Sequence, residues 1–244
     1  MKKVFTKAFL GICALGTTVV AFAQDAAPVA ETSFHQALKT KFIEGSADFM
    51  SMIAIALILG LAFVLERIIY LNLADTNADK LLEGIGAALD KGDVEAAKNI
   101  ARDTRGPIAS IAYQGLMRIN QGIDVVEKSI VSYGGVQGGL LEKNLSWITL
   151  FIAMAPSLGF LGTVIGMVMA FDKIEQVGDI SPTVVAGGMK VALITTVGGL
   201  IVALLLQIFY NYLLSKLESI LNKMEDASIT LLDQVIKYNV KFQK

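Results

Sequence analysis

Among the hydroxyl side chains inside the long apolar stretches of the sequence, three threonines are placed where they could act on an ion. Thr163 stands in SLGFLGTVIGMVMAF, residues 157–171, and Thr195 and Thr196 are adjacent in a later apolar run. A threonine oxygen can solvate a proton or a small cation through a neighbouring water, or it can bond back to a carbonyl of its own helix without further consequence. Both interpretations are open from the spacing alone: Thr163 and Thr196 line a polar path, or they are silent.

One ammonium group, that of Lys190, interrupts the third apolar pattern. It follows Pro182 by eight residues, which places it about 12 Å into a helix and about 160° around from Ala192. A charge within a membrane segment is a functional hypothesis by default. The alternative is that the lysine reaches the outer interface, toward Asp172 or Glu175.

Other kinds of chemistry are excluded by what the sequence omits. No Asp or Glu lies within the apolar runs 49–65, 145–171 and 191–206, so a proton relay needs a titratable group from a partner. The only cysteine, Cys13, falls in a signal-like start, and the only histidine, His35, lies in the N-terminal tail. No disulfide, thiol nucleophile, metal ion or other cofactor is therefore expected. The spans carry no Ser-His pair and no HExxH, so we predict that the chain is not an enzyme.

Small residues follow one face of the second apolar stretch. Gly159, Gly162 and Gly166 fall with two alanines on an arc of about 80°, although each glycine in a helix costs roughly 1 kcal/mol against alanine. The third stretch has a similar face, made of Ala192, Thr196, Gly199 and Ala203. Such faces let backbones approach closely in lipid. The two helices are therefore predicted to pack together through Gly159, Gly162, Gly166 and Gly199.

The elements that hold these residues follow from composition and hydropathy. The chain of 244 residues is 54% hydrophobic with a mean hydropathy of +0.60, which predicts an all-α membrane protein. Its net charge of -1 gives no basic excess for nucleic acid. Residues 1–23 have the lysines, the apolar core and the Ala21-Phe22-Ala23 site of a cleavable secretory signal. Three transmembrane helices are predicted at 49–72, 145–171 and 182–212, with an outer loop at 172–181.

Polar segments flank these predicted helices. Residues 24–48 form an outer tail, with either a short interfacial helix from Ser33 or a flexible chain, and residues 73–144 form an inner helical unit. GGVQGG at 134–139 lacks the GK[ST] of a phosphate loop and is predicted to be a hinge or kink. A cleaved signal leaves the mature N-terminus outside. Residues 73–144 and the C-terminus then lie inside, in weak agreement with the distribution of Lys and Arg.

The C-terminal helix, residues 213–244, extends the third span and carries an apolar seam with 3-4 spacing. Its positions are 214, 217, 221, 224, 228, 231, 235 and 238. Such a seam packs against another helix, either of the same chain or of a neighbouring subunit. Few other long inner helices are predicted, which favours self-association.

Together these motifs resemble the MotA/TolQ/ExbB proton-channel family over residues 49–235. Ala155-Pro156 followed by LGFLGTVIGMVMAF is similar to that family's second membrane helix, and TTVGGLIVALLLQIFYN (195–211) is similar to its third. The first span, ending in Glu66-Arg67, and the segment KGDVEAAKNIARDTRGPIASIAYQGL (91–116) also fit. Three spans with an outer N-terminus look like ExbB or TolQ rather than MotA.

The resemblance implies a motor subunit of the bacterial inner membrane. ExbB-like subunits form a ring, usually a pentamer, whose second and third helices line a pore. Single-span ExbD-like partners sit inside and supply the Asp that binds the proton. Proton flow then energises a TonB-like protein that opens outer-membrane transporters. Thr163 and Thr196 match the family's pore threonines, and Thr195 and Lys190 are further candidates for the pore or its mouth.

Departures from the family pattern and alternative functions stay open. Many relatives carry a Glu where this chain has Val191, and GGVQGG falls where relatives usually have a continuous helix. A TolQ-like role in envelope integrity, a non-conducting membrane scaffold, and Na⁺ in place of H⁺ all fit the same residues.

Overall fold

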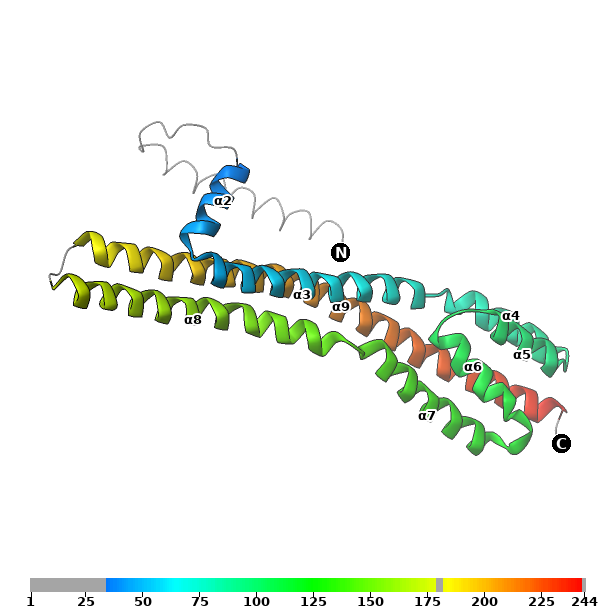
Figure 1. Ribbon diagram of the computed structural model, residues 1–244. Coiled ribbons are helices and arrows are strands. Elements are labelled where there is room, and N and C mark those ends of the chain that lie inside the picture. The colour runs from blue at the N-terminus through cyan, green and yellow to red at the C-terminus, as the bar shows by residue number, and fades with distance from the viewer. Residues whose placement is uncertain (1–33, 179–181, 243–244) are drawn as a thin grey trace, which may run out of the picture. The chain divides into compact units, whose positions relative to one another are not determined.

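The structure is a computed structural model that describes residues 34–178 and 182–242 (Figure 1). The predicted signal at 1–23 lies outside the described residues. The chain divides into two compact units, residues 1–43 and 44–244, which are described separately. In the N-terminal tail the structure has the helix α2 (Phe34–Glu44), so this segment is helical, and its placement at a membrane interface stays a prediction.

The second unit consists of helices, and the described part of the chain contains no strand. In chain order they are α3 (Ala47–Ala74), α4 (Ala78–Asp90), α5 (Val94–Asp103), α6 (Pro107–Met117), the 3-10 helix η1 (Ile119–Gln121), α7 (Ile123–Glu142), α8 (Leu145–Val177) and α9 (Pro182–Phe242). The predicted all-α class is therefore confirmed for the described residues.

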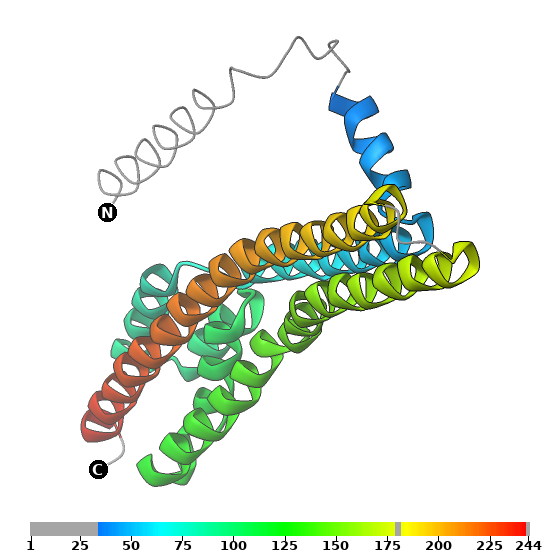
Figure 2. The same ribbon diagram turned by 90° about the vertical axis from the view of Figure 1, so that its left-hand side faces the viewer.

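Three long helices, α3, α8 and α9, contain the predicted apolar spans and are long and apolar enough to cross a membrane. Figures 1 and 2 show α8 and α9 side by side, and α3 packs against both. α8 continues past the predicted end at Phe171 to Val177, and Lys173, Glu175 and Gln176 in this added stretch are good helix formers. It ends at Gly178, whose left-handed backbone (φ 69°) lets its N–H bond to the carbonyl of Ile174 at 2.9 Å.

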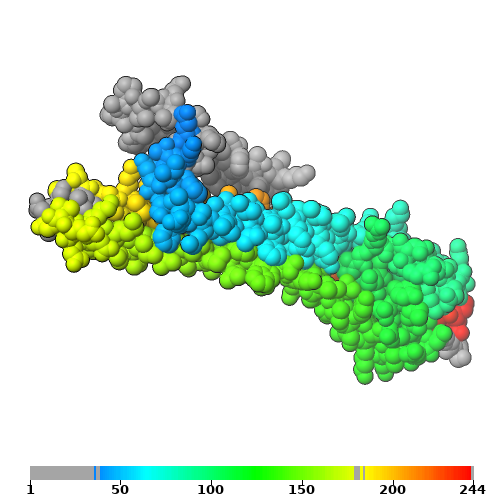
Figure 3. Space-filling view, viewed as in Figure 1, coloured from blue at the N-terminus to red at the C-terminus, as the bar shows by residue number. Residues whose placement is uncertain are grey.

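The four helices α4 to α7 form a polar helical unit (residues 78–142) that packs against the C-terminal half of α9. Its helices begin at ordinary local signals. The side chain of Asn77 accepts a bond from the N–H of Lys80 at 3.2 Å, and that of Asp93 accepts one from Ala96 at 2.9 Å. Pro107 stands in the first turn of α6. Figure 3 shows this unit, in teal and green, beyond the end of α3.

The seam of α9 packs within the chain, which is the first of the two alternatives that its spacing left open and not the self-association that was favoured. Its buried positions are Leu213, Leu217, Ile220, Met224, Ala227, Leu231 and Val235. Helices α4, α6 and α7 pack against this part of α9. Leu217, Met224, Leu231 and Val235 of the predicted row are buried, and its other four positions, 214, 221, 228 and 238, are half-buried beside them. Several short helices supply together the apolar surface that a single long partner helix supplies in a coiled coil.

The GGVQGG segment is not a hinge, which corrects the sequence prediction. Residues 134–139 lie inside α7, which runs without a break from Ile123 to Glu142. The buried side chains of Val126, Ile130 and Leu141 hold both halves of this helix against the core, and tertiary packing outweighs the weak helix propensity of glycine. The helix instead ends just afterwards, before Asn144, which adopts a left-handed backbone with φ 67°.

Candidate functional site

Glycines bring α8 and α9 into backbone contact, which we call the glycine contact (Gly159, Gly162, Gly166 and Gly199). A Cβ placed on Gly159 would lie 3.0 Å from the carbonyl oxygen of Thr195 and 3.0 Å from the Cα of Thr196. A Cβ placed on Gly162 would lie 2.6 Å from the Oγ1 of Thr195. These separations leave no room for a larger side chain, so the close approach of the two helices depends on both glycines.

The glycine contact continues in both directions along the helices. A Cβ on Gly166 would lie 3.2 Å from the carbonyl oxygen of Gly188, and a Cβ on Gly199 would collide with the carbonyl oxygen of Ala155. Gly188 was not singled out from the sequence, although it begins the 3-4 series 188, 192, 195 and 199 that could have indicated it.

Two threonine hydroxyls converge on one carbonyl at this contact. The side chain of Thr195 is fully buried, and its Oγ1 lies 2.9 Å from the oxygen of Ala192, 3.1 Å from that of Val191 and 3.5 Å from that of Gly159. The Oγ1 of the half-buried Thr196 lies 3.3 Å from the oxygens of both Ala192 and Gly159. A carbonyl oxygen has two lone pairs, so Gly159 can accept a bond from α9 as well as from its own helix.

Thr163 lies one turn along α8 from Gly159 and is half-buried. Its Oγ1 donates to the carbonyl of Phe160 at 2.5 Å. Within one chain, all three candidate hydroxyls therefore bond to backbone carbonyls. This agrees with the interpretation in which the hydroxyls only bond back to the backbone and have no role toward an ion. Thr163 and Thr196 are still partly exposed on the surface of the chain, whereas Thr195 is not.

Lys190 bonds to a carboxylate that sequence reasoning did not name. Its Nζ lies 2.6 Å from the Oε1 of Glu44, so the expected partners Asp172 and Glu175 are wrong. The geometry explains the difference, because Lys190 points away from the small face of α9 by about 160°. It therefore leaves the α8 contact and meets the residues that precede α3. The lysine side chain remains 51% exposed.

A second charged cluster, not singled out from the sequence, ties the end of α3 to α9 beyond the apolar span. Asp75 accepts hydrogen bonds from Lys216 and from Lys223, the latter at 2.6 Å. The bond from Lys216, followed by that from Lys223, holds the pKa of the Asp75 carboxyl below its ordinary value. This cluster lies in the polar part of the molecule, away from the threonines.

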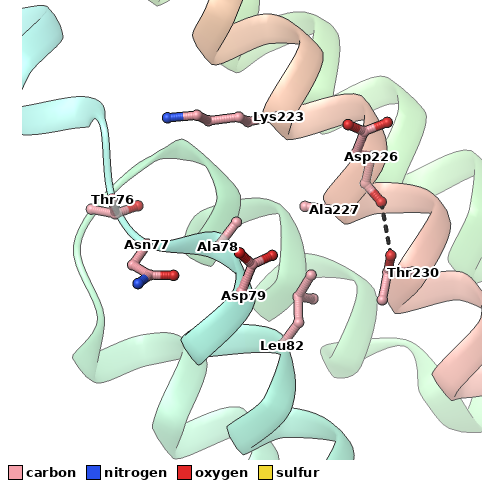
Figure 4. Close-up of a pocket in the computed structure, with 9 residues that line it drawn as sticks. All are labelled: Thr76, Asn77, Ala78, Asp79, Leu82, Lys223, Asp226, Ala227 and Thr230. Carbon is pink, nitrogen blue, oxygen red and sulfur yellow. Dashed lines mark hydrogen bonds between the residues drawn. The ribbon is translucent and has the colours of Figure 1, made fainter.

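Beside this cluster a hollow of about 340 Å³ opens between α4 and α9 (Figure 4). Figure 4 shows the carboxyl groups of Asp79 and Asp226 on the two facing helices. The Oγ1 of Thr230 donates to the backbone oxygen of Asp226 at 3.0 Å. Among the described residues no group of three or more His, Cys, Asp and Glu side chains is placed to hold a metal ion. The hollow therefore stays without an assigned ligand, and the glycine contact is the candidate site.

Comparison with known proteins shows which family the chain resembles. The family model described as the MotA/TolQ/ExbB proton channel family matches residues 103–226, which include all of α6, α7 and α8 and the glycine contact. A protein of Methanothermobacter thermautotrophicus described as a biopolymer transport protein ExbB homolog is 29% identical over 176 residues. Biopolymer transport protein exbB1 of Vibrio cholerae is 34% identical over 108 residues, and biopolymer transport protein ExbB of Aquifex aeolicus is 38% identical over 76 residues.

These matches cover parts of each protein. They span 71%, 37% and 31% of this chain, and 62%, 47% and 51% of the three relatives in the same order. The family match extends over half of the chain and contains the three threonines. The chain therefore belongs to the MotA/TolQ/ExbB proton channel family.

Proposed function

We propose that the chain is an ExbB-like subunit of a proton-driven motor in the bacterial inner membrane. In this proposal several copies, most simply five, surround a pore formed by α8 and α9, with H⁺ as the transported ion and no cofactor. A single-span ExbD-like partner supplies a carboxyl group inside the ring, and the motion energises a TonB-like protein.

The observation that carries the proposal is the placement of Thr163 and Thr196 on helices that the glycine contact holds together. Both residues are only half-buried, in an apolar region with no Asp or Glu of its own. A partner's carboxyl group there could exchange a proton with water held by these oxygens. The buried Thr195 has a different role in this proposal. Its Oγ1 bonds to Ala192 within α9 and lies 3.5 Å from the carbonyl oxygen of Gly159 on α8, and this second contact helps to hold the two helices in the register that places Thr196.

Proton uptake by sealed vesicles that contain this chain and an ExbD-like partner tests the pore assignment. Thr196→Val removes the hydroxyl and keeps the side-chain shape, so uptake should fall by about tenfold or more if loss of one polar contact costs about 1.5 kcal/mol. Uptake equal to that of the wild type would refute the role of Thr196. Repeating the measurement with Na⁺ replaced by K⁺ separates H⁺ from Na⁺ as the driving ion.

Ser157→Ala is the matched control for this experiment. Ser157 also lies in α8 and also bonds back to a carbonyl, that of Ala153 at 2.9 Å. It sits about 160° around the helix from Gly159, away from the glycine contact. Its removal should therefore leave proton uptake unchanged.

A non-conducting membrane scaffold is the second candidate, and one observation favours it. The hydroxyls of Thr163 and Thr196 already have carbonyl partners within the chain, so neither needs an ion to be satisfied. The scaffold predicts no proton uptake with any partner. Copurification separates the remaining alternative, because a TolQ-like subunit and an ExbB-like subunit would retain different single-span proteins.

A further inference from the structure

A buried arginine lies in the first apolar helix, just after its uncharged run. Arg67, in the second half of α3, is only 1% exposed. Its Nη2 donates to the carbonyl of Leu141, and the carbonyl of Leu140 lies 3.5 Å away. Both carbonyls belong to the last turn of α7. The guanidinium also lies 4.5 Å from the ring centre of Tyr70, one turn along α3.

The neighbouring residue, Glu66, contacts the other side of the junction between α7 and α8. Its Oε2 accepts a hydrogen bond from the Nδ2 of Asn144 at 3.2 Å, and its Oε1 lies 3.7 Å from the Nη1 of Arg67. Asn144 is the residue with left-handed backbone that separates α7 from α8. Two adjacent residues of α3 thus hold the end of one helix and the beginning of the next. We call Glu66, Arg67 and Asn144 the junction clamp.

The chemistry of the junction clamp suits a helix end. The last carbonyls of a helix have no partner within it, and a cation is favoured there by the helix dipole. Charge-assisted bonds from a guanidinium are also stronger and more directional than neutral ones. Burial of a charge is nevertheless costly, and an apolar residue of similar volume is often as stable or more stable. Stability alone therefore does not account for an arginine at this position.

We propose that Glu66 and Arg67 are positioning residues that set the angle between α7 and α8. Through this angle α3 fixes how the polar helical unit joins the helix that carries Thr163. The link to ion movement rests on the function proposed above, but the angle itself does not, and the two can be measured separately.

Spin labels on the full-length chain in lipid nanodiscs report the angle directly. Val131 on α7 and Val164 on α8 are 68% and 61% exposed, so both accept a label after substitution by Cys, with Cys13→Ser in the background. Val131 is 13 residues from Asn144, which is about 20 Å along the helix, so a change of about 10° moves it by roughly 3 Å. Dilution of labelled chains into an excess of unlabelled chains keeps the measured distance within one chain.

The variant Arg67→Met tests the proposal, because methionine fills a similar volume without any hydrogen-bond donor. The clamp predicts a distance distribution that is shifted by several ångströms or at least twice as wide, with thermal stability equal to or above that of the wild type. Arg67→Lys, which keeps a charged donor, should restore most of the wild-type distribution. Arg102→Met, at an exposed arginine of α5, is the control and should change nothing.

A second variant keeps the test decisive if Arg67→Met does not fold. Asn144→Gly retains the left-handed backbone but removes the amide that bonds to Glu66, and it should also widen the distribution. A wild-type distribution in Arg67→Met, or in Asn144→Gly when the first variant cannot be isolated, overturns the proposal.

Proton uptake by the same variants separates this inference from the proposed function. An altered distance together with uptake below the wild-type level supports the angle and its link to ion movement. An altered distance in the variants, when even the wild-type chain moves no protons, supports the angle and refutes the proposed function. Unchanged distances with normal uptake refute the clamp and leave the proposed function intact.

Discussion

At the scale of single residues, the glycine contact divides two adjacent threonines between different environments. Thr195 is buried against Gly162, while Thr196 keeps part of its surface free. The glycine face of α8 could be predicted, because its 3-4 spacing is visible in the sequence. The choice between Thr195 and Thr196 could not, because neighbouring residues differ by about 100° around a helix and the sequence does not show which side meets α8.

Gly162→Ala tests how closely the helices approach. The added methyl group would lie 2.6 Å from the Oγ1 of Thr195, so the helices must separate or Thr195 must turn away. Overpacking of this kind costs about 1–3 kcal/mol. Unfolding of the purified protein in mixed micelles by increasing SDS should therefore begin at a lower denaturant fraction.

Gly139→Ala provides the matched control for this prediction. A Cβ at Gly139 has no atom within 4 Å among the described residues, and alanine is the better helix former by about 1 kcal/mol. This variant should unfold at an equal or higher fraction of SDS. If both variants behave alike, the glycine contact is not tight.

At the scale of helices, the polar helical unit shows where sequence reasoning stops. The 3-4 spacing of the α9 seam predicts a partner, and the structure has one in α4, α6 and α7. The choice between a partner in the same chain and one in a neighbouring subunit could not be made from the sequence, because each of these helices is short and only their combined surface covers the seam. The break after α7 was placed at the glycines for a similar reason. Helix propensity alone predicts a break at GGVQGG, whereas buried side chains on both sides of this segment keep the helix continuous.

Asp75 joins the end of α3 to α9 and should make stability depend on pH. Its pKa in the folded chain is lower than the ordinary value of 3.8, chiefly because Lys216 and Lys223 donate to it. A lowered pKa contributes stability that is fully present above the ordinary value and is lost as the pH falls through the folded-state pKa. Asp75→Asn should therefore destabilise the protein at pH 7, and the difference from the wild type should shrink below about pH 4.

SDS unfolding of wild type and Asp75→Asn at a series of pH values measures this difference. Asp103→Asn is the control, because its contact with Arg102 at 3.7 Å joins two side chains that are 74% and 65% exposed, and exposed pairs contribute little. If the difference in unfolding SDS fraction between wild type and Asp75→Asn stays constant between pH 7 and pH 3, the stability contributed by Asp75, Lys216 and Lys223 does not depend on the charge of Asp75.

At the scale of the whole molecule, apolar and polar surfaces divide the long helices into two parts. Large apolar side chains are exposed along α3, α8 and α9, among them Ile58, Phe160, Val164, Leu193, Leu204 and Ile208. Exposure on this scale is unusual for a soluble monomer and suits contact with lipid or with other membrane helices. The charged side chains gather instead in the polar helical unit and the second half of α9. The number of spans could be predicted from hydropathy, but their direction depends on a signal at 1–23 that the structure does not describe.

Cysteine labelling decides that direction. Lys173→Cys, near the end of α8, and Ser219→Cys, on the second half of α9, place a thiol on exposed positions at either end of the third span, with Cys13→Ser in both. A maleimide that cannot cross membranes should label position 173 but not 219 in intact spheroplasts, and the reverse in inverted vesicles. Labelling of 219 alone in spheroplasts would invert the orientation and place the polar helical unit outside. Labelling of both positions from one side would mean that α9 does not cross the membrane, and a pore formed by α8 and α9 would then be impossible.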